Sequence, residues 1–242
     1  MRARVYQSLT VVFGLPDRLG SQIDRWRLMD MQGRSGSVLD VGCGSGNLLK
    51  ELQKTKSGRN VGIDFDPKAI EAAKSNGIDA RVSTIEEVSD GPYDNLLLNH
   101  VIEHVPDPLA FLKTAYEKIK CGGVAIIRTP NSNSRLARRF GDNWRGLEPP
   151  RHLNIFTVPS LRAVAKRAGF EVEEITSANA MLQGIYFESA RLKAASGGSG
   201  RRGTFHSLIA KLAFPGVVLM SSLARKKDDE CGEEVVAILR RP

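Results

Sequence analysis

Asp40-Val41-Gly42-Cys43-Gly44-Ser45-Gly46 is the stretch that decides the fold of this chain. It completes a short apolar run, residues 38–41, and three leucines at helical spacing follow within residues 48–52. Three closely spaced glycines let the backbone bend sharply and approach a ligand without an intervening Cβ. The pattern predicts a strand, a tight loop and a helix whose first amide groups face that ligand.

A second acidic residue, Asp64, ends the next apolar run at residues 61–64. A carboxylate at such a strand end can accept hydrogen bonds from two ribose hydroxyls at once. Asp66 is better placed to cap the helix that Pro67 opens, so we expect Asp64 to remain free for a ligand. Asn47 breaks the dinucleotide pattern G-x-G-x-x-G, and the actual spacing G-x-G-x-G therefore disfavours a dehydrogenase.

Apolar runs and helical patterns alternate along most of the chain. Further strands are expected at 80–82, 95–98, 124–127, 170–175 and 235–239, and helices at 21–31, 67–76, 107–120 and 160–168. We expect the helix from Asp107 to end at Gly122-Gly123, and Ser160 to cap the helix that Gly169 ends. Such alternation predicts a doubly wound, parallel α/β sheet.

Size and composition are those of one globular α/β domain. The chain has 242 residues, 41% of them hydrophobic, and a net charge of +8. The positive balance favours acidic partners such as nucleic acid, anionic lipid or phosphorylated metabolites, although a solvated basic face is the simpler interpretation. Three cysteines without a CxxC pair argue against a disulfide framework or a zinc cluster.

One apolar segment, residues 208–224 (LIAKLAFPGVVLMSSLA), needs its own interpretation. It is shorter than the ~20 apolar residues of a spanning helix, and it contains Lys211 and Pro215. We expect it to pack in the core, with a hairpin at the membrane surface as the alternative. The apolar run near the N-terminus predicts a helix or cap and not a signal peptide.

Four ordered motifs resemble those of the class I S-adenosylmethionine-dependent methyltransferases. They are VLDVGCGSG, VGIDFDP, PYDNLLLNHVIEHVPDP and IKCGGVAIIRTPN, and the final strand GEEVVAILRR adds to them. The resemblance covers residues 25–180 and implies a Rossmann-like, doubly wound, seven-stranded sheet, mostly parallel with an antiparallel last strand. Cys121 stands where the family usually has proline, which changes a turn.

The same resemblance implies a set of residues that bind S-adenosylmethionine. The glycine loop would hold the methionine part, Asp64 the ribose and Phe65 the adenine, while the ends of the third and fourth strands flank the adenine and the sulfonium. In chain order, the implied residues are Asp40, Gly42, Cys43, Gly44, Gly46, Asp64, Phe65, Ser83, Thr84, Ile85, Glu86, Asn99 and His100.

His100, Glu103 and His104 have the spacing i, i+3, i+4, which places them on one face if the segment is helical. His104 is a candidate general base for a hydroxyl acceptor, with His152 as the second candidate. The pattern also matches an inverted zinc-protease signature, which we reject because it lies within methyltransferase spacing.

Quinone-pathway and small-RNA 2′-O-methyltransferases carry a similar E-x-x-E-H segment, with a divalent metal in some members. Here His100 replaces the first glutamate, and His152 in PPRHLNIF resembles the distal histidine of the RNA enzymes. The resemblance implies a divalent metal held by His100, Glu103, His104 and His152. Alternatively, Glu103 and His104 only orient the neighbouring loop by hydrogen bonding.

The block that begins at Asp142 (DNWRGLEPPRHLNIF) resembles bacterial methyltransferases of cell-surface polysaccharide and lipid pathways. Trp144, Arg145, Arg151 and His152 could line an acceptor pocket, because aromatic and arginine groups suit sugars, phosphates or carboxylates. A surface loop is the alternative.

We therefore predict one methyltransferase domain, 1–242. Its parts are an N-terminal helical cap (1–35), a cofactor-binding core (36–130), an active-site loop (131–160) and C-terminal strands (161–242) with an apolar insert (205–224). The predicted activity is O-methylation of a small molecule, namely a sugar, a lipid-linked intermediate or a quinone-like phenol, in the cytoplasm or at the membrane periphery. RNA 2′-O-methylation and a non-catalytic, cofactor-binding membrane-surface protein remain the alternatives.

Overall fold

The computed structural model describes residues 34–55, 58–196, 203–228 and 230–242, and the helix expected at 21–31 lies outside them. Its strands are β1 (Val38–Val41), β2 (Asn60–Asp64), β3 (Asp79–Val82), β4 (Tyr93–Asn99), β5 (Ile119–Pro130), β6 (Glu171–Ala178) and β7 (Glu234–Arg240). Its helices are α3 (Asn47–Thr55), α4 (Pro67–Ser75), α5 (Pro108–Glu117), α6 (Arg135–Phe140), α7 (Val158–Arg167), α8 (Leu182–Ser196) and α9 (Gly203–Lys227). The single turns η2 (Ile102–His104), η3 (Gly141–Asn143) and η4 (Arg145–Leu147) complete the elements used below.

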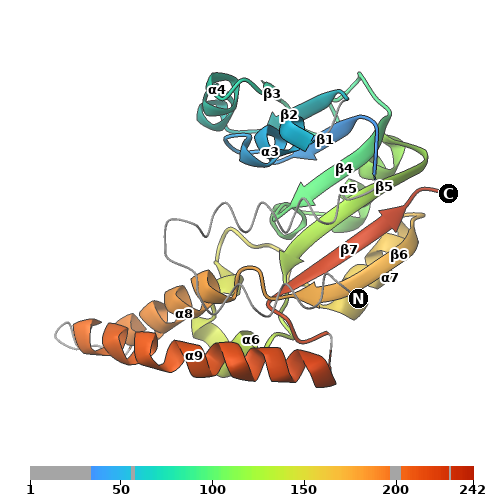
Figure 1. Ribbon diagram of the computed structural model, residues 1–242. Helices are drawn as coiled ribbons and strands as arrows, with labels where there is room; N and C mark the ends of the chain where they lie inside the picture. Colours follow the sequence, from blue (N-terminus) through green and yellow to red (C-terminus); the bar gives the residue numbers. More distant parts are fainter. Residues whose placement is uncertain (1–33, 56–57, 197–202, 229) are drawn as a thin grey trace.

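The strands form one seven-stranded sheet in the order β3-β2-β1-β4-β5-β7-β6 (Figure 1). Neighbours from β3 to β5 pair in parallel, and β7 runs antiparallel to both β5 and β6. The fold class predicted from the sequence is thereby confirmed, including the antiparallel last strand.

Two apolar layers cover the sheet because side chains alternate along its strands. Leu96 and Leu98 of β4 belong to the cluster that includes Phe111 of α5 and Leu161 of α7. Leu97, between them, belongs to the opposite cluster with helices α3 and α4. Burial on both faces explains why the central strands are continuous apolar runs.

Helices α6, α8 and α9 form an arm that projects from the sheet (Figure 1). Its own apolar cluster includes Phe140 of α6, Tyr186 of α8 and Val217 of α9. Residues 208–224 belong to one helix, α9, with Pro215 inside it, so the expected alternative of a hairpin is wrong. One face of the helix packs as expected, with Ala210, Val217 and Val218 buried in the apolar cluster of the arm. No helix in the described part of the chain combines the length and apolarity needed to cross a membrane.

Two predicted helix boundaries are wrong for local reasons. The helix expected to reach residue 120 ends at Glu117, because Ile119 already pairs with Tyr93 of β4. The helix expected from Ser160 begins at Val158, where Thr157 is the N-cap and its hydroxyl accepts from the Ser160 amide. Asp66 caps α4 as predicted, accepting from the amide of Lys68.

Truncation of leucines should destabilise the protein when the leucine lies in the core but not when it lies on the outer face of the arm. Leu49 is fully buried and Leu212 is 74% exposed. We expect Leu49→Ala to lower the free energy of unfolding by about 2–5 kcal/mol, and Leu212→Ala to change it by less than ~0.5 kcal/mol. Urea unfolding measures both; a comparable loss in the two variants would contradict the packing described here.

Candidate functional site

The site lies at the edge of the sheet where the parallel strands end. The strand order reverses between β1 and β4, because β2 lies on one side of β1 and β4 on the other. Such a switch point leaves a crevice beyond the carboxyl ends of the strands, which is where ligands bind in open α/β sheets. The glycine loop follows β1, Asp64 ends β2 and Asn99 ends β4, so three predicted cofactor segments meet there.

The glycine loop is bent into conformations that favour glycine. Gly42 has φ 71° and Gly44 has φ 54°. A Cβ at position 42 would lie 2.7 Å from a Val101 methyl group, whereas one at position 44 would meet nothing within 4 Å. The loop is therefore closed against the protein at Gly42 and open at Gly44.

Asp64 is half-buried and held by two backbone amides. Its Oδ2 accepts from Gly44 N (3.0 Å) and its Oδ1 from Asp66 N (2.9 Å). As expected, Asp66 and not Asp64 caps α4, but Asp64 is not without structural contacts. Each carboxylate oxygen nevertheless keeps acceptor capacity for a ligand hydroxyl, and the two amides fix its orientation.

The remaining predicted cofactor residues differ in accessibility. Phe65 is 82% exposed, and Ser83, Thr84 and Glu86 are also accessible at the end of β3. Ile85 is 2% exposed, so only its backbone could contact a ligand. Asp40 is buried at the end of β1, and burial raises the pKa of the half-buried Cys43 thiol to about 12.

His100 follows β4 in a left-handed conformation, with φ 55°. Its Nδ1 lies 3.2 Å from Glu103 Oε1 and its Nε2 lies 2.9 Å from Glu234 Oε1. Burial by itself lowers the pKa of His100, but the two carboxylates outweigh it and raise the pKa to about 9. Both ring nitrogens thus face carboxylates, and His100 is not one of the three side chains that lie together as potential metal ligands.

Glu103 is 1% exposed and links His100 to the rest of the site. Its Oε2 accepts from the hydroxyl of Thr129 at 3.0 Å. Burial raises the pKa of Glu103, but the hydrogen bond to His100 prevails and holds the pKa below its usual value. Arg128 lies 3.8 Å from Glu234, so two buried carboxylates share the positive charges of His100 and Arg128.

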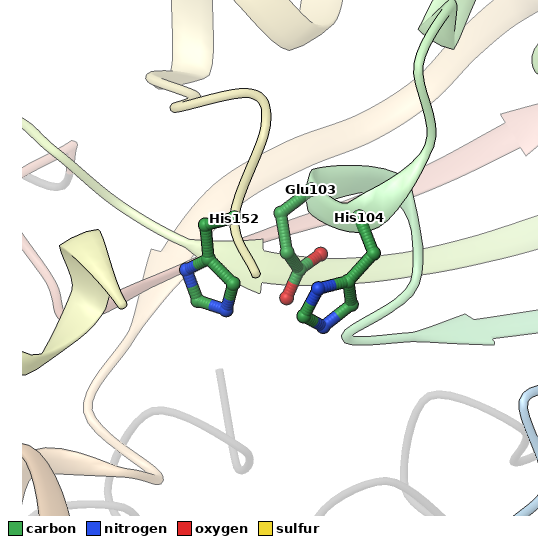
Figure 2. Close-up of side chains that lie close together, drawn as sticks. All are labelled: Glu103, His104 and His152. Carbon is green, nitrogen blue, oxygen red and sulfur yellow. The ribbon is translucent and has the colours of Figure 1, made fainter. Parts of the chain in front are cut away.

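Glu103, His104 and His152 form a compact cluster, to which each contributes one potential ligand atom within 4.8 Å of the others. Figure 2 shows their side chains converging from the turn after β4 and from a separate segment. The segment is not an α-helix, so the condition for His100, Glu103 and His104 to share one helical face is not met. It forms only the 3-10 turn η2, which begins after His100.

Both imidazoles of the cluster have a defined tautomer. Nδ1 of His104 faces the carbonyl oxygen of Arg151 (2.8 Å), and Nδ1 of His152 faces that of Gly146 (2.6 Å). Because a carbonyl only accepts, each Nδ1 donates its proton, and in the neutral ring each Nε2 keeps a lone pair, although Nε2 of His152 also lies 3.4 Å from Oε2 of Glu148. Burial lowers the pKa of His152, which favours the neutral ring.

The segment that carries His152 is fastened to the turn after β4. The amides of Leu153 and Asn154 donate to the carbonyl oxygen of Glu103 (2.8 and 3.0 Å), and the Asn154 side chain donates to Val105 O (2.6 Å). These contacts bring together two motifs that are far apart in the sequence.

Several residues of this region were not identified from the sequence. Glu148, with φ 31°, binds Arg145 and Arg151 and lies 3.4 Å from Nε2 of His152. Two features of the sequence could have identified them. Glu234 is a charged residue at the start of an apolar strand, and Glu148 directly precedes two prolines. The predicted pocket role of Trp144 is wrong, because its side chain is 2% exposed and packs within the arm.

Comparisons with known proteins agree with this arrangement. A family model described as "Methyltransferase domain" matches residues 16–175. The ubiquinone biosynthesis O-methyltransferase of Nitrosospira multiformis is 33% identical over 153 residues, covering 57% of this chain and 64% of the relative. That of Marinobacter nauticus is 34% identical over 109 residues, covering 40% of this chain and 45% of the relative. The matches thus span about half to two thirds of these relatives.

Solved structures share the fold. An S-adenosylmethionine-dependent methyltransferase from Thermotoga maritima, described as a possible histamine N-methyltransferase, has a TM-score of 0.58 and 18% identity, covering 91% of this chain and 92% of its own. The geranyl diphosphate C-methyltransferase of Streptomyces coelicolor, solved with Mg²⁺, geranyl diphosphate and S-adenosyl-L-homocysteine, has a TM-score of 0.60 and 16% identity, covering 93% and 80%.

Titration of His100 should reveal its two carboxylate partners. We expect its imidazole to titrate near pH 9, above the ordinary value of about 6.5. Its contribution to stability is then complete below about pH 6.5 and is lost as the pH rises through about 9. Nuclear magnetic resonance of the ring, in chelator-treated protein, measures the midpoint.

Glu234→Gln is the matched variant, because it removes one carboxylate charge and keeps the shape. Its His100 midpoint should fall below that of the wild type. A wild-type midpoint near the ordinary value, or one unaffected by Glu234→Gln, would refute the paired arrangement.

Proposed function

The chain belongs to the methyltransferase-domain family, and from that membership we propose that it transfers a methyl group from S-adenosylmethionine to an oxygen of a small molecule. The resemblance inferred from the four motifs is thereby confirmed. The observation that carries the proposal is the carboxylate of Asp64, oriented by the Gly44 amide at the switch point of the sheet.

The cofactor would lie along the ends of β1, β2, β3 and β4. The open side of Gly44 and the carboxylate of Asp64 suit the polar parts of the molecule, and the exposed ring of Phe65 suits its adenine. When bound, the cofactor supplies an already activated methyl group, so the protein has mainly to align the acceptor.

His104 and His152 are the proposed catalytic residues. Each holds its Nδ1 proton against a backbone carbonyl, which leaves Nε2 to accept the proton of an acceptor hydroxyl. The half-exposed ring of His104 is accessible to an acceptor, while His152 is more enclosed. Asn154 positions His152 through its contact with the turn after β4.

The same cluster suits a divalent metal. Two imidazoles with their second nitrogens bonded to carbonyls, and one ionised carboxylate, are a donor set typical of zinc or a transition metal. Glu103, His104 and His152 would hold the ion, and it would supply acidification of the acceptor hydroxyl. His100 stays outside this set because its ring nitrogens face Glu103 and Glu234.

The acceptor class follows from the relatives and from the arm. The relatives' names support a quinone-like hydroxyl, and the exposed apolar face of α9 supports an acceptor that is itself lipid-linked. Contact of residues 208–224 with a membrane surface would then bring enzyme and acceptor together.

Replacement of Asp64 tests the cofactor site. Asp64→Ala should weaken S-adenosylhomocysteine binding by about 10- to 100-fold, because a charge-assisted hydrogen bond contributes about 1.5–3 kcal/mol. Calorimetry measures the affinity, and transfer of labelled methyl to small-molecule fractions of a cell extract should fall with it. Asp79→Ala, the same charge change at an exposed position of β3, is the control.

Unchanged affinity in Asp64→Ala would contradict the site. Tight S-adenosylhomocysteine binding without any labelled small-molecule product would leave the cofactor site standing and refute the proposed activity.

Cobalt(II) titration tests the metal cluster without an activity assay. Chelator-treated protein should bind Co²⁺ with a new visible absorption band, and His152→Ala should weaken binding by at least about tenfold, since it removes a direct ligand. Lys113→Ala, on the outer face of α5, is the control. No band, or equal affinity in His152→Ala, would show that these residues serve only as bases and positioning groups.

A further inference from the structure

Helix α9 presents an apolar stripe on its outer face. Four of the nine exposed large apolar side chains in the described residues lie on this helix: Leu212 (74%), Leu219 (59%), Met220 (46%) and Leu223 (46%). Positions 212, 219 and 223 are separated by whole helical turns and therefore share one face. The opposite face, with Ala210, Val217 and Val218, is buried in the arm.

Three arginines of α6 lie beside this stripe. Arg135, Arg138 and Arg139 line a pocket of about 600 Å³ together with Gly216 and Met220 of α9. Met220 belongs to both features, so the pocket borders the stripe directly.

Within the residues that the structure describes, none of the three arginines forms an ion pair. The buried carboxyl of Glu233 interacts electrostatically with Arg135 but lies outside ion-pair distance. Arg138 donates to the carbonyl oxygen of Asn133 (2.8 Å), and Arg139 lies over the rings of Phe140 and Tyr186. An anionic ligand would supply a countercharge for Arg138 and Arg139 in particular, and guanidinium groups suit phosphate.

We propose that α6 and α9 form a docking face for the surface of an anionic lipid bilayer. The leucines of the stripe enter the boundary between headgroups and acyl chains, and the arginine pocket receives lipid phosphates. Apolar area beside clustered cations is the combination that binds a helix in the plane of a membrane. A second copy of this chain fits less well, because a two-fold contact through this face would bring two sets of arginines together.

The arm lies at the same edge of the sheet as the candidate site. Helix α6 follows the end of β5, and α8 and α9 connect the end of β6 to the start of β7. All three helices thus emerge at the edge of the sheet that holds the candidate site. If the proposed function holds, docking presents this edge to an acceptor that resides in the bilayer.

Vesicle sedimentation of the full chain tests the proposal. Vesicles of phosphatidylcholine alone are compared with an equal mixture of phosphatidylcholine and phosphatidylglycerol. We expect binding to the mixed vesicles that weakens as salt is added. The triple variant R135Q/R138Q/R139Q should bind about 100-fold more weakly, because the loss of each arginine is expected to weaken binding by a factor of about five.

Two further variants separate charge from apolar contact. L212S/L219S/L223S should weaken vesicle binding at least about tenfold and keep the wild-type circular dichroism, because these side chains are exposed. R162Q/K166Q/R167Q removes the same charge from α7, outside the arm, and should bind like the wild type. Asp64→Ala should also bind like the wild type, so a failure of docking is distinguishable from a failure of methyl transfer.

Several results would overturn the proposal. They are absence of vesicle binding, equal binding to phosphatidylcholine alone, or equal losses in the α6 and α7 variants. Displacement by millimolar inorganic phosphate would assign the pocket to a free phosphate. Tight RNA binding without vesicle binding would assign it to nucleic acid, and a leucine-dependent dimer that binds no vesicles would assign the stripe to a second copy.

Discussion

Pairing of β1 with β2 on one side and β4 on the other is the constraint on which the rest of the structure depends. Val41 pairs with Ile63 and with Leu98, so the residues that follow these three strands emerge side by side. The glycine loop can then turn back over β2, where Gly42 and Cys43 donate to the Ile63 carbonyl and Gly44 donates to Asp64. The glycine loop and the Asp64 carboxylate thus hold each other in place at the end of the sheet.

The arrangement of the residues after β4 depends on buried charged groups. Two carboxylates, Glu103 and Glu234, are 1% exposed, and such burial is costly unless each is paired and hydrogen-bonded. Protonated His100 lies between them and thereby fixes the orientation of Glu103. Glu103 in turn holds the segment of His152 through its backbone carbonyl. The cluster of Glu103, His104 and His152 is therefore held from two sides, by His100 at the Glu103 carboxylate and by the Glu103 backbone at the His152 segment.

Local chemistry made much of this predictable from the sequence. Continuous apolar runs gave the central strands because both faces are buried, and the cap at Asp66 followed from a carboxylate placed before Pro67. The glycine spacing and Asp64 predicted the edge of the sheet at which the candidate site lies, because parallel strands bring their carboxyl ends to a common side. Boundaries at Glu117 and Val158 escaped prediction, since strand pairing and a threonine cap outweighed the glycine and serine signals.

The sequence by itself determined the alternating sheet, the glycine-bent loop and the histidine and glutamate after the fourth parallel strand, since each is encoded within a few neighbouring residues. Only the tertiary structure decided the partners of those side chains. Glu234 reaches His100 across 134 positions, and Arg151 reaches His104 across 47. Helix α9 likewise packs one face against α8 and leaves Leu212 outside, although both faces are apolar in sequence. Contacts between distant segments depend on the closed fold, which no local pattern specifies.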